Sequence, residues 1–208
     1  QTQTVHDITK CAFYGPKLDV NVQPAVGNEI TLSTCQLDFC LPAKFNLYYI
    51  DKDGEKKTPV VLHRAILGSL DRFMAYILEE TKGNLPTWLA PVQTRVMPVK
   101  TDDEALNAYA KEVYDTLMEN DIRVELDDRA EKLGYRMRDG QIQKVPYLLV
   151  IGMNEKDNKT VTFRLHGEQE TTTLPLDEFV ENLKKEINEK AKTNRAHPVR
   201  FIKYRDIT

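Results

Sequence analysis

The stretch "HRAILGSLDRF", residues 63–73, places a histidine at the end of an apolar run, then a glycine, then an arginine one turn into a predicted helix. Each residue type suits a different chemistry. His63 could bind a metal ion, Gly68 would let a ligand approach the backbone closely, and the forked guanidinium of Arg72 suits a phosphate. Taken alone, the pattern is more often a buried strand, a turn and a helix with a solvated arginine.

Three other short stretches hold polar residues of comparable interest. They are "CAFYGPKLD" at 11–19, "TCQLDFCLP" at 34–42 and "PTWLAPVQ" at 86–93. Within them Tyr14, Lys17 and Gln36 are candidate ligand contacts, as is Ser69 in the first stretch. Each also has a plain structural interpretation, as a turn-packing tyrosine, a solvated lysine or a polar group at a strand end.

The first third of the chain is predicted to form antiparallel strands that position these residues. "KLDVNV" and "EITLSTCQLDF" flank a loop at 24–27, and "FNLYYID" and "PVVLH" flank a turn signal at Asp53–Gly54. A helix is predicted from Ser69 to Glu80, with Leu70, Phe73 and Ile77 on one face. Four strands and one helix leave sheet edges and a face uncovered. Since the chain also begins with Gln1, we expect it to be a piece of a longer polypeptide.

The remainder of the chain alternates strands with helices. After a Pro- and Gly-rich stretch at 83–91, strands are predicted at 92–99, 122–127, 145–152, 160–165 and 171–176, with helices at 101–121, 130–143 and 177–191. A capping box of Thr101 and Glu104 is expected to start the first of these helices. This order predicts a mixed sheet flanked by helices. The tail from Thr193 is basic, and we expect it to be mobile.

The overall composition limits the classes of partner. With 29 basic and 32 acidic residues the net charge is −3, so nucleic acid would have to bind a local basic patch. Such a patch is predicted from Arg129, Lys132 and Arg136 on one helical face, although a run of charges is more often a solvated face. Three cysteines suit a reducing cytoplasm rather than disulfides or a self-contained zinc site. No apolar run approaches the roughly 20 residues that span a bilayer, so no membrane contact is expected.

Taken in order, the four motifs resemble the C-terminal half of threonyl-tRNA synthetases, which are class II aminoacyl-tRNA synthetases. The resemblance continues through "IRVELDDRAEKLGYRMRD" and "QKVPYLLVIG". It implies a fold that is α/β and α+β, with part of a class II antiparallel sheet followed by an anticodon-binding domain whose mixed sheet is flanked by helices. The implied domains are residues 1–86, an incomplete catalytic domain, residues 87–192, the anticodon-binding domain, and a basic tail at 193–208.

The resemblance also assigns roles to the first set of residues. Gly68, Ser69 and Arg72 fall in the third class II motif, where they would bind ATP, which enters with magnesium as a substrate of the parent enzyme. Arg72 would stabilise the ATP phosphates, Lys17 would balance the adenylate phosphate, and Tyr14 and Gln36 would contact the substrate. His63 matches one of three zinc ligands, and the other two would lie upstream of this chain. Zinc that coordinates the amino group and hydroxyl of threonine would reject valine, which an apolar pocket separates poorly.

The same resemblance assigns anticodon reading to Arg138, Glu155 and Arg164. By the same resemblance, Ala130 falls where relatives would carry a polar base-reading residue, and the alanine side chain can make no hydrogen bond to a base.

The implied activity is ATP-dependent activation of threonine and its transfer to tRNA(Thr) by a cytoplasmic homodimer, with this chain alone inactive. An alternative is a free-standing tRNA- or RNA-binding regulatory protein without catalysis. A generic α/β interaction domain explains four ordered motifs least well.

Overall fold

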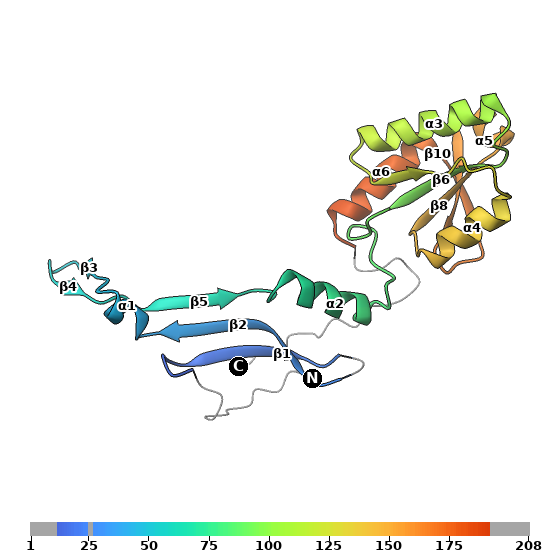
Figure 1. The fold of residues 1–208 in the computed structure, drawn as a ribbon. Coiled ribbons are helices and arrows are strands. Elements are labelled where there is room, and N and C mark those ends of the chain that lie inside the picture. The colour runs from blue at the N-terminus through green and yellow to red at the C-terminus, as the bar shows by residue number, and fades with distance from the viewer. Residues whose placement is uncertain (1–11, 25–26, 192–208) are drawn as a thin grey trace, which may run out of the picture. The chain divides into compact units, whose positions relative to one another are not determined.

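The computed structural model describes residues 12–24 and 27–191, which form two compact units dividing between Glu80 and Thr81 (Figure 1). The first unit holds strands β1–β5 and helices α1 and α2, and the second holds β6–β10 and α3–α6. Cys11 and the tail expected to be mobile from Thr193 lie outside the described residues. No helix within these described ranges is long and apolar enough to cross a membrane.

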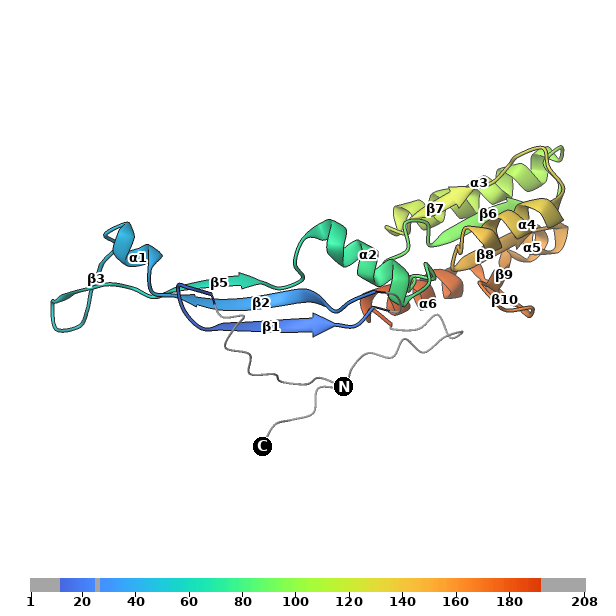
Figure 2. The ribbon, with the colours of Figure 1, turned by 60° about the horizontal axis from the view of Figure 1, so that its bottom comes forward.

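The first unit is built on a three-stranded antiparallel sheet in which β2 lies between β1 and β5 (Figure 1 and Figure 2). The strands are β1 (Lys17–Val22), β2 (Ile30–Asp38) and β5 (Val61–Ala65). Alternation gives the sheet two different faces. One carries polar side chains, among them Lys17, Gln36 and His63, whereas the opposite face exposes apolar ones such as Leu18 and Leu62.

The pairing predicted for residues 45–51 with 59–63 is wrong. β3 (Tyr49–Ile50) pairs instead with β4 (Lys56–Lys57) in a separate two-stranded hairpin, and β5 pairs with β2. Asp51 explains the short hairpin, because its carboxylate accepts a hydrogen bond from the Asp53 N–H at 2.8 Å and forms an ion pair with Lys57. The turn therefore closes within its own polar residues, and the apolar strand that follows is free to join the larger sheet.

Two helices complete this unit. The short α1 (Leu41–Lys44) was not predicted, and it begins where Asp38 accepts hydrogen bonds from the N–H groups of Cys40 and Leu41, both at 2.9 Å. The predicted helix after "GS" is present as α2 (Leu70–Glu80). It has no buried residue, since Phe73 and Ile77 are only partly covered and Leu70 is 73% exposed. An apolar helix face exposed to this extent is typical of a surface that packs against another part of a protein.

The second unit confirms the predicted mixed sheet flanked by helices. Its strand order is β10-β9-β8-β6-β7, parallel from β7 through β6 to β8 and antiparallel from β8 to β10. The strands are β6 (Thr94–Pro98), β7 (Val124–Leu126), β8 (Tyr147–Ile151), β9 (Thr160–Leu165) and β10 (Thr171–Pro175). The helices are α3 (Glu104–Glu119), α4 (Leu133–Ile142), α5 (Met153–Asn158) and α6 (Leu176–Asn188).

Helices cover both faces of this sheet, with α3 and α4 on opposite sides (Figure 1). Apolar residues of α3 and α6 pack with those of β6, β8 and β9 in the larger core; they include Val96, Val113, Leu117, Leu149, Val161, Phe179 and Leu183. On the other face, Leu133 and Met137 of α4 pack against Met97 and Leu148. Gly140 permits this approach, because a Cβ there would lie 2.5 Å from the Leu148 Cδ2.

Two local predictions in this unit need correction. The N-cap of α3 is Asp103, which accepts hydrogen bonds from the N–H groups of Ala105 and Leu106, so Thr101 does not form the expected capping box. An aspartate is an N-cap as good as a threonine, and here it lies directly before the first helical residue. The second predicted helix begins at Leu133 rather than at 130.

Candidate functional site

Four of the predicted residues of the first unit lie together on the polar face of its sheet. Lys17 lies directly opposite Gln36, and Gln36 lies directly opposite His63, so the three form a row across β1, β2 and β5. Directly opposed residues present their side chains on the same face. The Tyr14 hydroxyl donates a hydrogen bond to the Gln36 Oε1 at 2.5 Å, and its ring meets that of His63 edge-on at 6.1 Å.

Asp38 belongs to this site, although it was not among the predicted site residues. Its side chain is fully buried, and its Oδ2 lies 2.8 Å from the His63 Nε2. Burial acts to raise the pKa of Asp38, but hydrogen bonds from the Leu41 N–H, His63 and the Cys40 N–H outweigh burial and lower the pKa below its usual value. The available signal was strand alternation, which places Asp38 on the face of Gln36, two residues earlier.

The ammonium group of Lys17 is held by a neighbour on its own strand. Its Nζ lies 2.7 Å from the Asp19 Oδ2, with about a quarter of each side chain exposed. The Asp19 Oδ1 is buried without a hydrogen-bond partner among the described residues. Lys17 therefore stands in the row as a half-buried cation beside a carboxylate that can still accept a hydrogen bond.

The predicted phosphate-binding residues lie at the other end of β2. Gly68 has φ +69°, and a Cβ there would lie 3.1 Å from the Leu32 carbonyl oxygen, so a glycine is needed by the turn itself. Arg72 is exposed, and its Nη1 donates to the Thr31 carbonyl oxygen at 3.3 Å. Ser69 lies just before α2, and its Oγ accepts from the Arg72 N–H at 3.4 Å.

The seven residues predicted to contact a ligand therefore lie near two different ends of β2. Near one end are Tyr14, Lys17, Gln36 and His63, and near the other are Gly68, Ser69 and Arg72. Thr31, beside Arg72, and Gln36 are five residues apart in β2, which corresponds to about 17 Å of strand. A ligand that touches both groups has to be extended along β2.

His63 is the predicted metal ligand of this chain. No cluster of three or more His, Cys, Asp or Glu residues that could hold a metal occurs in residues 12–24 and 27–191. His63 directs Nε2 toward Asp38, which leaves Nδ1 as the nitrogen able to bind a metal. A histidine backed by a carboxylate is typical of zinc ligands, so the chemistry of His63 with Asp38 fits a single zinc ligand.

The three candidate base-reading residues of the second unit are associated with the α4 side of its sheet. Arg164 of β9 pairs with Leu148, which packs against α4, and Arg138 is an exposed residue of α4 itself. Glu155, at the start of α5, accepts hydrogen bonds from the Gly152 N–H at 2.9 Å and the Thr162 Oγ1 at 2.7 Å. Both carboxylate oxygens of Glu155 thus already serve in local structure. The half-buried Arg164 donates from Nε to the Glu168 carbonyl.

The predicted basic patch of Arg129, Lys132 and Arg136 is wrong. Arg136 is fully buried and donates to the carbonyl oxygens of Asp127 and Pro98, both at 2.7 Å, and of Glu131 at 3.1 Å. Because α4 begins only at Leu133, Arg129 precedes the helix and pairs with Asp127 and Asp139. These guanidinium groups fix the loop before α4 and do not form an exposed helical face.

Comparison with protein families agrees with this two-unit architecture. Residues 1–81 match the tRNA synthetase class II core domain (G, H, P, S and T), and residues 93–186 match the anticodon binding domain. The two matches, in this order, define part of a class II aminoacyl-tRNA synthetase.

The relatives identify the family more narrowly. The chain is 53% identical over 180 residues to the threonine--tRNA ligase of Staphylococcus saprophyticus, covering 86% of this chain and 28% of the relative. It is 52% identical over 172 residues to threonine--tRNA ligase 1 of Bacillus subtilis, covering 82% of this chain and 26% of the relative. The chain belongs to the threonyl-tRNA synthetase family, and it spans about a quarter of the length of these relatives.

Solved structures give the same picture. The RNA binding domain of threonyl-tRNA synthetase from Cryptosporidium parvum superposes with a TM-score of 0.76 at 38% identity, covering 85% of this chain and 44% of that one. Prolyl-tRNA synthetase from the same organism has a TM-score of 0.66 at 18% identity, covering 90% of this chain and 43% of that one, which shows a shared fold.

Proposed function

We propose that this chain is the part of a threonine--tRNA ligase that supplies one end of the adenylate site and the anticodon-reading unit. The observation that carries the proposal is the row of Lys17, Gln36 and His63 on one polar face, with Arg72 at the far end of β2. The division into residues 1–86, 87–192 and 193–208 belongs to this proposal, as do a cytoplasmic location and a homodimeric intact enzyme.

In the first step, a carboxylate oxygen of threonine attacks the α-phosphorus of ATP, and pyrophosphate leaves. Negative charge gathers on the phosphate oxygens, so catalysis rests on positioned cations. Arg72 binds phosphate with its guanidinium, and Lys17 neutralises the adenylate phosphate from the other end of β2. Gln36 and Tyr14, already hydrogen-bonded to each other, hold the substrate between them. Magnesium enters with ATP. In the second step a hydroxyl at the 3′ end of tRNA attacks the adenylate carbonyl, and AMP leaves.

His63 would hold one position of a zinc site whose other ligands would belong to the rest of the intact enzyme. When bound, zinc would coordinate the amino group and hydroxyl of threonine and so reject valine. Asp38 keeps the imidazole oriented through its hydrogen bond to Nε2.

The second unit reads the anticodon of tRNA(Thr) with residues on the α4 side of its sheet. Arg138 is exposed and available to a base edge, whereas Arg164 and Glu155 would have to share their present partners with the RNA. Unpaired bases are recognised by hydrogen bonds to their edges and by stacking, worth about 1–3 kcal/mol per base. Ala130 offers no side-chain hydrogen bond, so one base contact would come from elsewhere.

A free-standing RNA-binding protein without catalysis is the second candidate. It would explain the match of residues 93–186 to an anticodon binding domain. It would not require the Tyr14–Gln36 and His63–Asp38 hydrogen bonds on the polar face of the first unit.

A hybrid enzyme distinguishes the two candidates. This chain would replace the matching segment of the Staphylococcus saprophyticus threonine--tRNA ligase, with which it shares 53% identity. We expect the hybrid to charge tRNA(Thr) with threonine, while the isolated chain shows no ATP–pyrophosphate exchange. A folded hybrid without activity, or exchange by the isolated chain, would contradict the proposal.

A further inference from the structure

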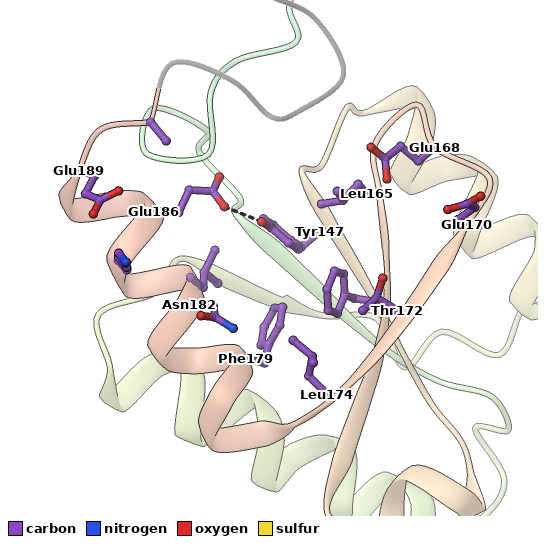
Figure 3. Close-up of a pocket in the computed structure, with 14 residues that line it drawn as sticks. Tyr147, Leu165, Glu168, Glu170, Thr172, Leu174, Phe179, Asn182, Glu186 and Glu189 are labelled. Atoms are coloured by element: carbon purple, nitrogen blue, oxygen red, sulfur yellow. Dashed lines mark hydrogen bonds between the residues drawn. The ribbon is translucent and has the colours of Figure 1, made fainter.

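A cavity of about 720 Å³ lies in the second unit between α6 and the strands β8, β9 and β10 (Figure 3). Three aromatic rings, those of Tyr147, Phe163 and Phe179, line it and contact one another, with centroids 5.1–5.7 Å apart. Phe163 and Phe179 belong to the α3 and α6 side of the sheet. The cavity therefore lies on the face opposite α4 and Arg138, and the anticodon proposal does not use it.

The rim of the cavity is acidic. Glu168 and Glu170 stand on the side of the β9–β10 hairpin, and Glu186 and Glu189 stand on the opposite side, at the end of α6 (Figure 3). Lys185 is the one cation among the residues that line the cavity. The Tyr147 hydroxyl donates to the Glu186 Oε2 at 2.5 Å, which holds one carboxylate above the aromatic floor.

Aromatic rings beneath carboxylates suit a cation on an aliphatic stem. A guanidinium or ammonium group is attracted to the ring faces and forms charge-assisted hydrogen bonds with carboxylates. Phosphate-bearing ligands such as RNA are repelled by four glutamates. The chemistry of the cavity thus selects arginine or lysine side chains of a peptide.

A basic peptide begins at the cavity itself. Ala191, the last described residue, lines the cavity, and residues 192–208 follow it with five basic side chains against the single acidic Asp206. We propose that this segment of the chain binds in the cavity, where its positive charge would complement the four glutamates. Arg195 is four residues beyond Ala191, a distance that an extended chain spans at up to about 14 Å.

The covalent connection favours the chain's own segment over other basic peptides. A tethered ligand is present at an effective concentration in the millimolar range, so contacts too weak for a separate peptide are sufficient. The bound segment would cover the aromatic floor and neutralise the rim.

Zero-length carbodiimide crosslinking of the full chain tests this proposal, because it joins a lysine only to a carboxylate in direct contact. We expect amide bonds from Lys192 or Lys203 to Glu168, Glu170, Glu186 or Glu189, mapped by mass spectrometry. The Lys159–Glu112 ion pair, at 2.8 Å, must crosslink in the same sample as a positive control. The Lys159–Glu112 product without any crosslink from Lys192 or Lys203 to these four glutamates would overturn the proposal.

Mixing ¹⁵N-labelled and unlabelled chains identifies the source of the bound segment. We expect both ends of each cavity crosslink to carry the same isotope, and mixed-isotope products alone would assign the cavity to a second copy and overturn the proposal.

Matched variants test the charge argument. The double variant Glu186→Gln and Glu189→Gln should lower the crosslink yield at Glu168 and Glu170 roughly threefold or more. Glu178→Gln with Glu181→Gln removes the same charge from exposed positions of α6 and should leave that yield unchanged. Equal losses in the two variants would contradict specific binding of the segment to the rim.

Discussion

The Nε2 atom of His63 lies 2.8 Å from the Oδ2 of Asp38, a carboxylate whose side chain is fully buried. The other oxygen of Asp38 accepts hydrogen bonds from the N–H groups of Cys40 and Leu41 at the start of α1. The fold of the first unit therefore orients the imidazole without any ligand, with its Nδ1 available.

Replacing Asp38 by Asn should weaken zinc binding by the hybrid enzyme about 10–100-fold. If the asparagine keeps its oxygen toward the α1 N–H groups, its amide donates to Nε2, which moves the imidazole proton to Nδ1 and blocks metal binding there. Zinc affinity is measured by competition with a chelator. Asp51→Asn, in the exposed hairpin, is the control and should bind zinc as before. Unchanged zinc affinity in Asp38→Asn would refute the orienting role.

Arg72→Ala should lower the ATP-dependent rate of the hybrid enzyme by at least about tenfold, because a charge-assisted hydrogen bond contributes roughly 1.5–3 kcal/mol. ATP–pyrophosphate exchange measures this rate. Arg64→Ala is a matched control, since Arg64 is also exposed but follows His63 in β5 and so points to the other face of the sheet. An equal loss of rate in both variants would show that Arg72 has no specific contact with phosphate.

Arg136→Ala and Arg138→Ala should affect different properties of the protein, stability in the first case and RNA binding in the second, although the two residues are only two positions apart in α4. Loss of the buried Arg136 leaves three carbonyl oxygens without their donor and should lower the free energy of unfolding by roughly 3 kcal/mol or more. Loss of the exposed Arg138 should leave stability unchanged and weaken tRNA(Thr) binding about tenfold. Denaturant titration followed by the fluorescence of Trp88, the single tryptophan, reports on the second unit. RNA binding that survives Arg138→Ala intact would remove that residue from the reading surface.

Acid should reduce the contribution of Asp139 to stability. The hydrogen bond from Arg129 lowers the pKa of Asp139 below 3.8, aided by Arg95 and against the effect of burial. Since the folded pKa is the lower one, this contribution is complete above the unfolded value and is lost as pH falls through the folded value. The difference in unfolding free energy between the wild-type chain and Asp139→Asn should therefore shrink below about pH 4. The control is Asp115→Asn, which removes an exposed ion pair with Lys111. Its unfolding free energy should differ little from that of the wild-type chain at every pH. A constant difference for Asp139→Asn would contradict the ion-pair assignment.

The second unit was predictable because its sequence alternates between strand and helix periods. Apolar residues at helical spacing in α3 and α6 face the core, among them Tyr109, Val113, Phe179 and Leu183. The six-residue α5 was too short to leave a periodic pattern.

Side-chain roles that depend on distant backbone were not predictable. Arg136 has the spacing of a solvated helical residue, but its partners include the Pro98 carbonyl at the end of β6, 38 residues away. Similarly, the pairing of β5 with β2 depends on a hairpin that closes through Asp51 and Lys57, a contact that the turn signal at Asp53–Gly54 does not specify. The role of Asp38 was missed as well, because strand alternation places it on the face of Gln36 but its burial results from α1 and β5 together.

Titration of this chain with tRNA(Thr), and with the same transcript mutated in the anticodon, tests the central claim most directly. Both titrations must use one fixed salt concentration, because phosphate contacts depend strongly on salt. We predict that the anticodon mutation weakens binding by about tenfold or more, as expected for the loss of one or more base contacts. Equal affinity for the two transcripts would mean that the second unit binds only phosphates, and it would contradict anticodon reading by this chain.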